Sequence, residues 1–179
     1  MQALLLGALL LVSPPPPVAG HTRVIDYHPT HMKVASTASG SCWTGSIAAN
    51  RPDAYRCMTG NEISDPCFVR DAKSVACPDI PTADSGLIIK LTKPLPDNRV
   101  SGAATPWAMS LAGHVGCRVG TGTVIDGFPY YCTGSLVCAE ASAPPQSSQF
   151  FTECGTGQAG PSGAHVVSKK RYAVITIWR

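Results

Sequence analysis

The chain has 179 residues and a formal net charge of +3, and only 14 % of its residues are charged. The length suits one domain of about 100–150 residues rather than two. The low share of charge excludes a disordered chain kept open by self-repulsion. The 17 glycines and 16 prolines interrupt helical patterns, which argues against helical bundles, coiled coils and doubly wound folds. We expect a mostly β fold: a small, disulfide-stabilised antiparallel sheet or barrel-like domain with long loops and little helix.

Residues 1–20 have the pattern of a secretory signal peptide. An apolar run, 3–12, is followed by Ser13, four prolines and the small residues Val18 and Gly20. The run is too short for a membrane-spanning helix, which needs about 20 residues, so we expect cleavage after Gly20 and no stable membrane anchor. The start of the segment is weak for a signal peptide, since no Lys or Arg precedes the apolar run. The expected product is secreted, either extracellular or associated with the cell wall.

The rest of the chain divides by composition. Residues 21–40 combine three histidines with Ser, Thr and Gly without periodicity, which predicts a flexible N-terminal arm. Residues 41–179 contain all eight cysteines and are predicted to form a single disulfide-rich β domain. Proline, serine and glycine predict surface loops at 139–149 and 155–163.

Three segments have strand patterns. Residues 86–93 alternate with period two, and apolar residues alternate with small ones across 107–111. Residues 172–178 are apolar at nearly every position, which is typical of a central strand covered on both faces. The dipeptide Asp126-Gly127 favours a tight hairpin turn between two further apolar stretches.

Eight cysteines are ordinary in an exported chain, where they oxidise to disulfides. A gap of 40 residues separates two groups of four, so local pairing within each group is the simplest arrangement. The expected pairs are Cys42 with Cys57, Cys67 with Cys77, Cys117 with Cys132, and Cys138 with Cys154. The close-spaced cysteine pairs of zinc sites are missing from the sequence, so we expect disulfides rather than a metal site.

The pairing in the second group has an alternative. An ideal two-residue hairpin turn places Thr121, not Cys117, opposite Cys132. A bulge near Gly120 or Gly122 would restore the register. Without it, Cys117 would pair with Cys138.

The aromatic cluster Phe128, Tyr130 and Tyr131 is the candidate binding edge. It lies beside the predicted hairpin tip, whereas the other aromatic side chains are expected to fill the core. We predict that these three rings face outward and contact an unknown extracellular or cell-wall ligand. The predicted function is a secreted, non-catalytic binding or cell-envelope-associated module.

The alternative is a secreted hydrolase acting on carbohydrate or peptide. The segment around His114, with Ser135 as nucleophile, is faintly similar to chymotrypsin-like proteases, but the glycine-flanked nucleophile motif is missing. Asp53, Glu62 and Asp65 are candidate carboxylates of a glycosidase, although Asp in loop-rich sequence more commonly caps turns. An open cleft containing His114 or two of these carboxyl groups would favour the hydrolase.

No cofactor is expected. His21, His28 and His31 could bind copper, but a surface arm explains them more simply. Basic residues are scattered apart from 169–171, which predict a solvated hairpin tip rather than a polyanion site. Nucleic acid is therefore not an expected partner.

Several motifs resemble those of a group of uncharacterised, secreted, cysteine-rich bacterial proteins. They include Cys42-Trp43-Thr44-Gly45, Arg51-Pro52-Asp53-Ala54-Tyr55-Arg56-Cys57, Asp65-Pro66-Cys67-Phe68, Cys77-Pro78 and Pro106-Trp107-Ala108. The likeness covers about residues 42–178. It implies export and a compact domain but no particular reaction, and Cys138 and Cys154 look like a pair added to the group's pattern.

Overall fold

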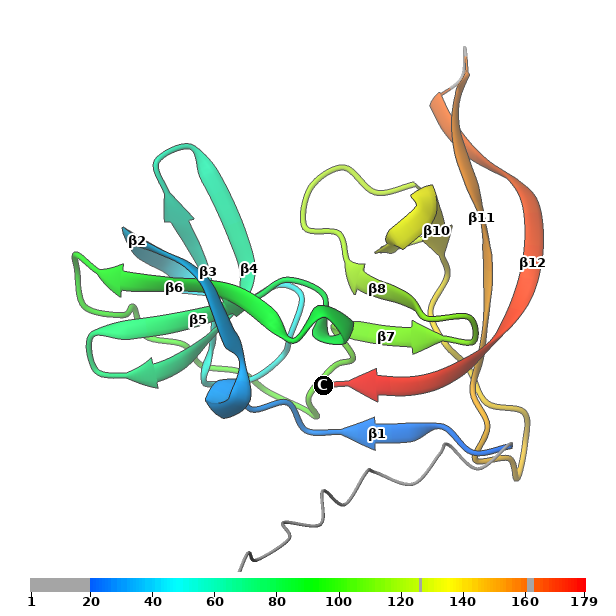
Figure 1. The fold of residues 1–179 in the computed structure, drawn as a ribbon, viewed down its shortest axis with the longest axis horizontal. Coiled ribbons are helices and arrows are strands. Elements are labelled where there is room, and N and C mark those ends of the chain that lie inside the picture. The colour runs from blue at the N-terminus through cyan, green and yellow to red at the C-terminus, as the bar shows by residue number, and fades with distance from the viewer. Residues whose placement is uncertain (1–19, 126, 161–162) are drawn as a thin grey trace, which may run out of the picture.

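The computed structural model describes residues 20–125, 127–160 and 163–179, which form two β units side by side (Figure 1). The first unit is a closed five-stranded barrel. Its strands are β2 (Lys33–Gly45), β3 (Ala54–Thr59), β4 (Glu62–Asp71), β5 (Ser74–Pro78) and β6 (Ser85–Leu91). They follow one another as an antiparallel meander, and the barrel closes because β6 pairs with β2 in parallel.

The second unit is a seven-stranded sheet in the order β1-β12-β11-β10-β9-β8-β7. Its strands are β1 (Arg23–Ile25), β7 (Ala108–Leu111), β8 (Val115–Val119), β9 (Tyr130–Cys132), β10 (Leu136–Cys138), β11 (Phe151–Gly160) and β12 (Gly163–Trp178). Because β12 also pairs with β7, the six strands from β7 to β12 form a closed ring of strand pairings. Helical structure in the described ranges is limited to the short 3-10 turns η1 (Pro29–His31), η2 (Pro81–Ala83) and η3 (Thr133–Ser135).

Strands dominate the described chain, and the mostly β, disulfide-stabilised fold is confirmed. The strand predicted at 86–93 is β6, and the one at 107–111 is β7. The C-terminal strand is central, as expected, because the end of β12 lies between β7 and β1.

Two expectations about irregular segments are wrong. Residues 21–40 contain β1 and the first part of β2, and the buried hydroxyl of Thr22 donates to the Val174 carbonyl at 2.6 Å. Of the loop predicted at 155–163, residues 155–160 belong to β11 and Gly163 to β12, and residues 161–162 lie outside the described residues. Both segments are mostly exposed, so neither carries the apolar alternation that marks a strand in sequence.

All four expected disulfides are confirmed, and each joins two neighbouring strands. The bridges follow the same plan in both units: they join β2 to β3 and β4 to β5 in the first, and β8 to β9 and β10 to β11 in the second. Each closes a loop of 10–16 residues, which contributes about 3 kcal/mol in the chain-entropy model.

The register that joins Cys117 to Cys132 is set by a loop rather than a simple hairpin. Phe128 N–H donates to the Ile125 carbonyl at 2.8 Å across the tight turn, as the sequence predicts, although Asp126 itself lies outside the described residues. Residues 120–124 then loop out opposite Pro129, and Cys117 becomes the partner of Cys132. The displaced residues include both glycines at which a register correction is expected.

A buried aromatic cluster joins the two units. Trp107 precedes β7 and is fully buried, with its ring centroid 5.6 Å from that of Phe68 in β4. Tyr27, between β1 and η1, lies 5.2 Å from Trp107 and 5.1 Å from Phe68. Burial raises the pKa of Tyr27 to about 12. The cluster is separate from the hydrophobic cluster inside each unit, so it acts as a shared core between them.

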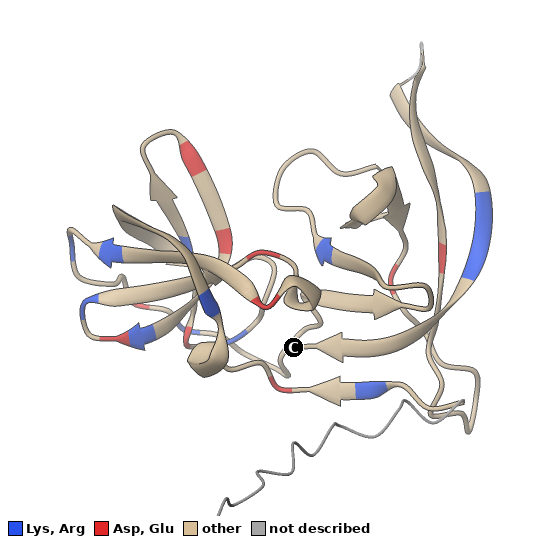
Figure 2. Ribbon diagram, viewed as in Figure 1, with Lys and Arg blue, Asp and Glu red and all other residues tan. Residues whose placement is uncertain are grey.

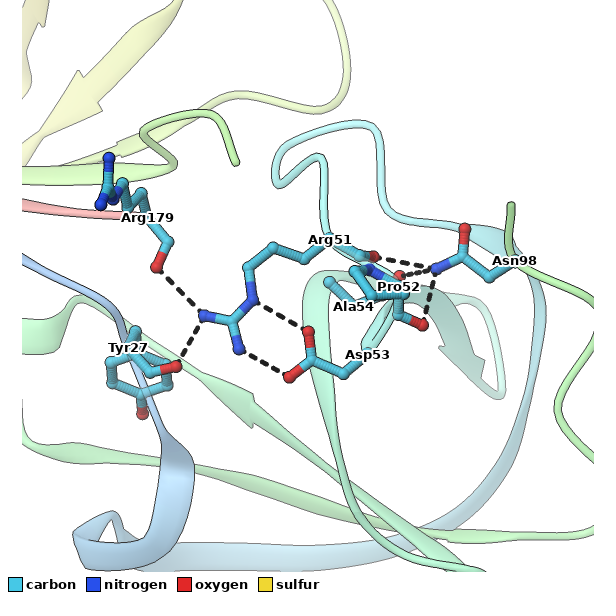
Figure 3. Close-up of polar contacts among 7 residues, drawn as sticks. All are labelled: Tyr27, Arg51, Pro52, Asp53, Ala54, Asn98 and Arg179. Atoms are coloured by element: carbon cyan, nitrogen blue, oxygen red, sulfur yellow. Dashed lines mark hydrogen bonds and ion pairs between the residues drawn. The ribbon is translucent and has the colours of Figure 1, made fainter. Parts of the chain in front are cut away.

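The Arg51 side chain ties the same junction together with polar contacts (Figure 3). Its Nη1 donates to the carbonyls of Tyr27 at 2.7 Å and Arg179 at 3.0 Å, while Nε and Nη2 donate to the two carboxylate oxygens of Asp53 at 2.9 and 2.6 Å. The guanidinium also lies 4.8 Å from the centroid of the Phe68 ring. One side chain therefore holds the loop before β3, the linker after β1 and the residue after β12.

Candidate functional site

The predicted aromatic binding edge is mostly buried. Phe128 and Tyr130 are 8 % and 5 % exposed, and the Tyr130 hydroxyl donates to the Pro106 carbonyl at 2.9 Å. Burial, reinforced by the charge of Glu140, raises the pKa of Tyr130. Tyr131 is 37 % exposed, but its hydroxyl donates to the Thr123 carbonyl at 2.6 Å. The expectation that all three rings face outward is wrong, because Tyr130 belongs to the hydrophobic cluster of the second unit and Phe128 is nearly buried, with Lys169 over its ring.

A groove nevertheless lies beside Phe128. It consists of two adjoining hollows of about 520 and 340 Å³ that share Ala139 and Glu140, and we call it the Glu140 groove. The first hollow is apolar and is lined by Val124, Ile125, Gly127, Phe128 and Pro129. The second is more polar and is lined by Ser142, Phe151, Thr152, Glu153 and Arg171.

Two cations of β12 border the groove, each above an aromatic ring. Lys169 Nζ lies 5.1 Å from the centroid of the Phe128 ring and 4.0 Å from a carboxylate oxygen of Glu153. The Arg171 guanidinium lies 4.1 Å from the centroid of the Phe151 ring. These residues lie within β12 and not at the hairpin tip predicted for 169–171, and Figure 2 shows them as a blue band on the outer curve of that strand.

Arg171 and Glu140, which both line the second hollow, have no charged partner among the residues that the structure describes. Arg171 is exposed and donates no hydrogen bond there, and Glu140 is exposed and forms no ion pair. A guanidinium that stacks on a ring keeps its N–H groups, which lie in its own plane, available at its edge. The groove thus combines an apolar hollow with one available cation and one available carboxylate.

His114 lies in a different part of the molecule. It occupies the β7–β8 turn with a φ of 62°, and lines a cleft of about 540 Å³ together with Ser110 and Thr82. No carboxyl group is among the residues that line this cleft. Ser135, the nucleophile considered from the sequence, lies in η3 and is not part of the lining.

None of four hollows in the described structure, including the cleft at His114, is lined by the candidate carboxylates Asp53, Glu62 and Asp65. Asp53 is held by Arg51, and Glu62 is exposed at the start of β4. Asp65 is 1 % exposed and accepts hydrogen bonds from the Ser46 hydroxyl and, at 3.2 Å, from Ile47 N–H. Burial raises the pKa of Asp65 and outweighs these two hydrogen bonds, which lower it.

The raised pKa predicts how Asp65 affects stability as pH changes. A carboxyl whose pKa is higher in the folded than in the unfolded protein stabilises the fold at low pH, and this contribution is lost as pH rises through the folded pKa. Asp65→Asn cannot ionise, so we expect its unfolding free energy, relative to the unmodified protein, to rise between about pH 3 and pH 7. Urea denaturation across this range measures the difference.

Asp71→Asn is the control with the opposite sign. Hydrogen bonds from the Ser74 hydroxyl at 2.6 Å and Lys73 N–H at 2.7 Å lower the pKa of Asp71. The relative unfolding free energy of this variant should therefore fall as pH rises. A pH-independent difference for Asp65→Asn would contradict the assignment.

Metal binding gains no support from the described residues. The only group of three or more ligand-bearing side chains there is Cys117, Cys132 and Cys138, and all three sulfurs are already in disulfides. His21, His28 and His31 are exposed and form no such group. In the same ranges, no helix is both long and apolar enough to cross a membrane.

Comparisons with protein-family models, curated proteins and solved structures find no match to this chain. Functional inference therefore depends on the geometry of the molecule itself. The sequence pattern assigns Lys169 and Arg171 to a solvated hairpin tip rather than to a site, and it does not single out Glu140. The first two could have been found by extending the strand predicted at 172–178 toward the N-terminus, since period two places both on one face.

Proposed function

We propose that the protein is a secreted or cell-envelope-associated, non-catalytic binding module whose ligand occupies the Glu140 groove. The observation that carries this proposal is Arg171, which stacks on Phe151 at the groove wall with no acceptor for its N–H groups among the described residues. Arginine in this arrangement recognises planar anions by paired N–H donors. A ligand carboxylate is the group that fits it.

The rest of the groove favours an extended peptide. Val124, Ile125 and Pro129 form an aliphatic hollow that suits an apolar side chain, and the exposed Ser142 supplies a hydroxyl group for a backbone amide. Carbohydrate binding usually needs an open aromatic ring on which a sugar can stack. Here Phe128 is nearly buried and Lys169 lies over it. The proposed ligand is thus a peptide segment with an acidic side chain followed by an apolar one.

Selection from a displayed library of linear ten-residue peptides tests the proposal. We expect the oxidised protein to enrich sequences that pair Asp or Glu with an aliphatic residue. Titration calorimetry with an enriched peptide should show about tenfold weaker binding to Arg171→Gln, since a charge-assisted hydrogen bond contributes about 1.5 kcal/mol. Arg70→Gln, which removes an exposed arginine of β4 in the other unit, should leave the affinity unchanged.

Other outcomes would contradict this proposal. Enrichment without acidic residues, or equal affinity of the two arginine variants, would exclude Arg171 as the recognition residue. Tight binding to neutral oligosaccharides on a glycan array would favour a carbohydrate ligand instead.

The alternative of a secreted hydrolase retains one candidate location, the cleft that contains both Ser110 and His114. A hydrolase there would use Ser110 as nucleophile and His114 as base. A labelled fluorophosphonate should leave Ser110 unmodified if the protein is a binding module. Stoichiometric labelling at Ser110, lost in His114→Ala, would favour the hydrolase.

A further inference from the structure

The hairpin of β11 and β12 extends beyond all the other strands (Figure 1). Its outer part, which we call the arm, comprises residues 156–160 and 163–168, paired from Thr156 with Val167 to Gly160 with Gly163. The pairing of β10 with β11 ends at Thr156, and the pairing of β7 with β12 begins only at Val174. Each edge of the arm therefore has a stretch of backbone without a neighbouring strand.

A two-stranded ribbon of this kind is marginally stable by itself, whereas three or more strands support one another. Most side chains of the arm are exposed, and the exceptions, Gly160, Val166 and Val167, are only half-buried. Unpaired strand edges present N–H and C=O groups that another strand can join. The longer of the two open edges belongs to β12, which lacks an outer neighbour from Gly163 to Tyr172.

The charge pattern of the arm indicates what can join that edge. Proteins usually protect open edges with charged residues, especially lysine. The described residues of the arm contain no Asp, Glu, Lys or Arg, and the cations of β12 begin only at Lys169, at its base. Such an edge offers no charge to attract an acidic or basic partner, and no like-charge repulsion to keep two copies apart.

We propose that the arm pairs with the arm of a second copy of this chain, β12 edge to β12 edge. Antiparallel pairing about a two-fold axis near His165 forms a four-stranded ribbon, and such an interface is isologous, with the same residues contributed by both copies. It also places the two Lys169–Arg171 clusters at opposite ends of the ribbon. None of the described arm residues lines the Glu140 groove, so this inference does not depend on the proposed ligand.

The first test is sedimentation velocity of the oxidised full-length protein. The pairing surface is smaller than a standard interface of about 1,600 Å², so we expect reversible dimers whose fraction rises with concentration in the micromolar to millimolar range. A protein that stays monomeric across the whole range would overturn the proposal.

The second test locates the edge with matched charge pairs. Ala159 and Ala164 are partners across the arm and both are exposed, but only Ala164 belongs to β12. Ala164→Lys and Ala164→Glu should each weaken the dimer several-fold, and a 1:1 mixture of the two variants should restore it, because opposite charges then meet across the interface. The corresponding Ala159→Lys and Ala159→Glu proteins should dimerise like the unmodified chain, separately and mixed.

Two other outcomes of the charge-pair experiment would contradict the proposed pairing of β12 edges. If the Ala159 variants weaken and rescue the dimer while the Ala164 variants do not, the β11 edge is the interface and the proposed pairing is wrong. If neither set has an effect, the contact lies outside the arm. Hydrogen exchange should be compared at low and high protein concentration. We expect the backbone amides of the arm to exchange more slowly in the dimer, and the amides of the first unit to exchange at an unchanged rate.

Discussion

Replacement of Arg51 by alanine is expected to lower the free energy of unfolding by about 2–4 kcal/mol. The Arg51 side chain is 11 % exposed and makes four hydrogen bonds, two to Asp53 and one each to the carbonyls of Tyr27 and Arg179. Its removal leaves the half-buried carboxylate of Asp53 and both carbonyls without this donor. Chemical denaturation of the oxidised protein, followed by tryptophan fluorescence, measures the loss.

Arg99→Ala is the matched control for this prediction. Arg99 pairs with Asp97 through the same two-residue spacing, at 2.8 Å, but the two side chains are 89 % and 72 % exposed. Exposed ion pairs contribute at most about 1 kcal/mol, so the control should change stability far less. Arg51→Lys should recover only part of the loss, because a single ammonium group cannot serve both carbonyls and both carboxylate oxygens. Equal effects of Arg51→Ala and Arg99→Ala would show that the junction does not depend on this side chain.

The sequence predicts those parts of the fold that are determined by residues close together in the chain. Each disulfide closes a short loop between strands adjacent in the chain, so the simplest pairing of cysteines is also the pairing that two neighbouring strands impose. The strand β6 shows its period in sequence because buried and exposed side chains alternate along much of it.

Long-range pairing explains what the sequence does not reveal. The strand β2 pairs in parallel with β6, for example Lys33 with Ser85, and most of its side chains are exposed. A strand that is selected by distant partners and buries little carries no local hydrophobic pattern, so a Ser- and Thr-rich segment resembles a flexible arm. In residues 155–160 and 163 the pairing is local, and the hydrophobic pattern is missing because the hairpin buries few side chains.

The sequence predicts the candidate site only in part, for a related reason. The hairpin turn near Gly127 is a local signal, and the sequence predicts it correctly. That Phe128 is nearly buried and lines a groove is not visible in the sequence. Which rings face outward depends on the register shift at residues 120–124 and on the return of β11 and β12 beside them. The contacts of Lys169 with Phe128 and of Arg171 with Phe151 are set by that tertiary arrangement, and no single segment encodes them.

The shared aromatic core leads to the second large effect, which concerns cooperativity. Trp107→Ala is expected to lower the free energy of unfolding by about 3–5 kcal/mol, because it removes the largest fully buried side chain from the junction. Each unit retains its own hydrophobic cluster and two disulfides. We therefore expect the variant to unfold in two separate calorimetric transitions, whereas the unmodified protein unfolds in one.

Two further variants separate the shared core from ordinary core packing. Trp107→Phe retains most of the ring contacts with Phe68 and Tyr27 and removes an indole N–H that is buried without a partner in the described structure, so its loss should be about 1 kcal/mol. Met109→Ala makes a cavity inside the second unit alone and should lower the stability of that unit. In Met109→Ala the junction is intact, so the first unit should unfold together with the destabilised second unit. A first unit that unfolds separately, with the stability it has in the unmodified protein, would mean that the junction has been lost. A single transition in Trp107→Ala, with a loss no larger than that of Trp107→Phe, would show that the two units are joined by the polar contacts of Arg51 rather than by the aromatic cluster.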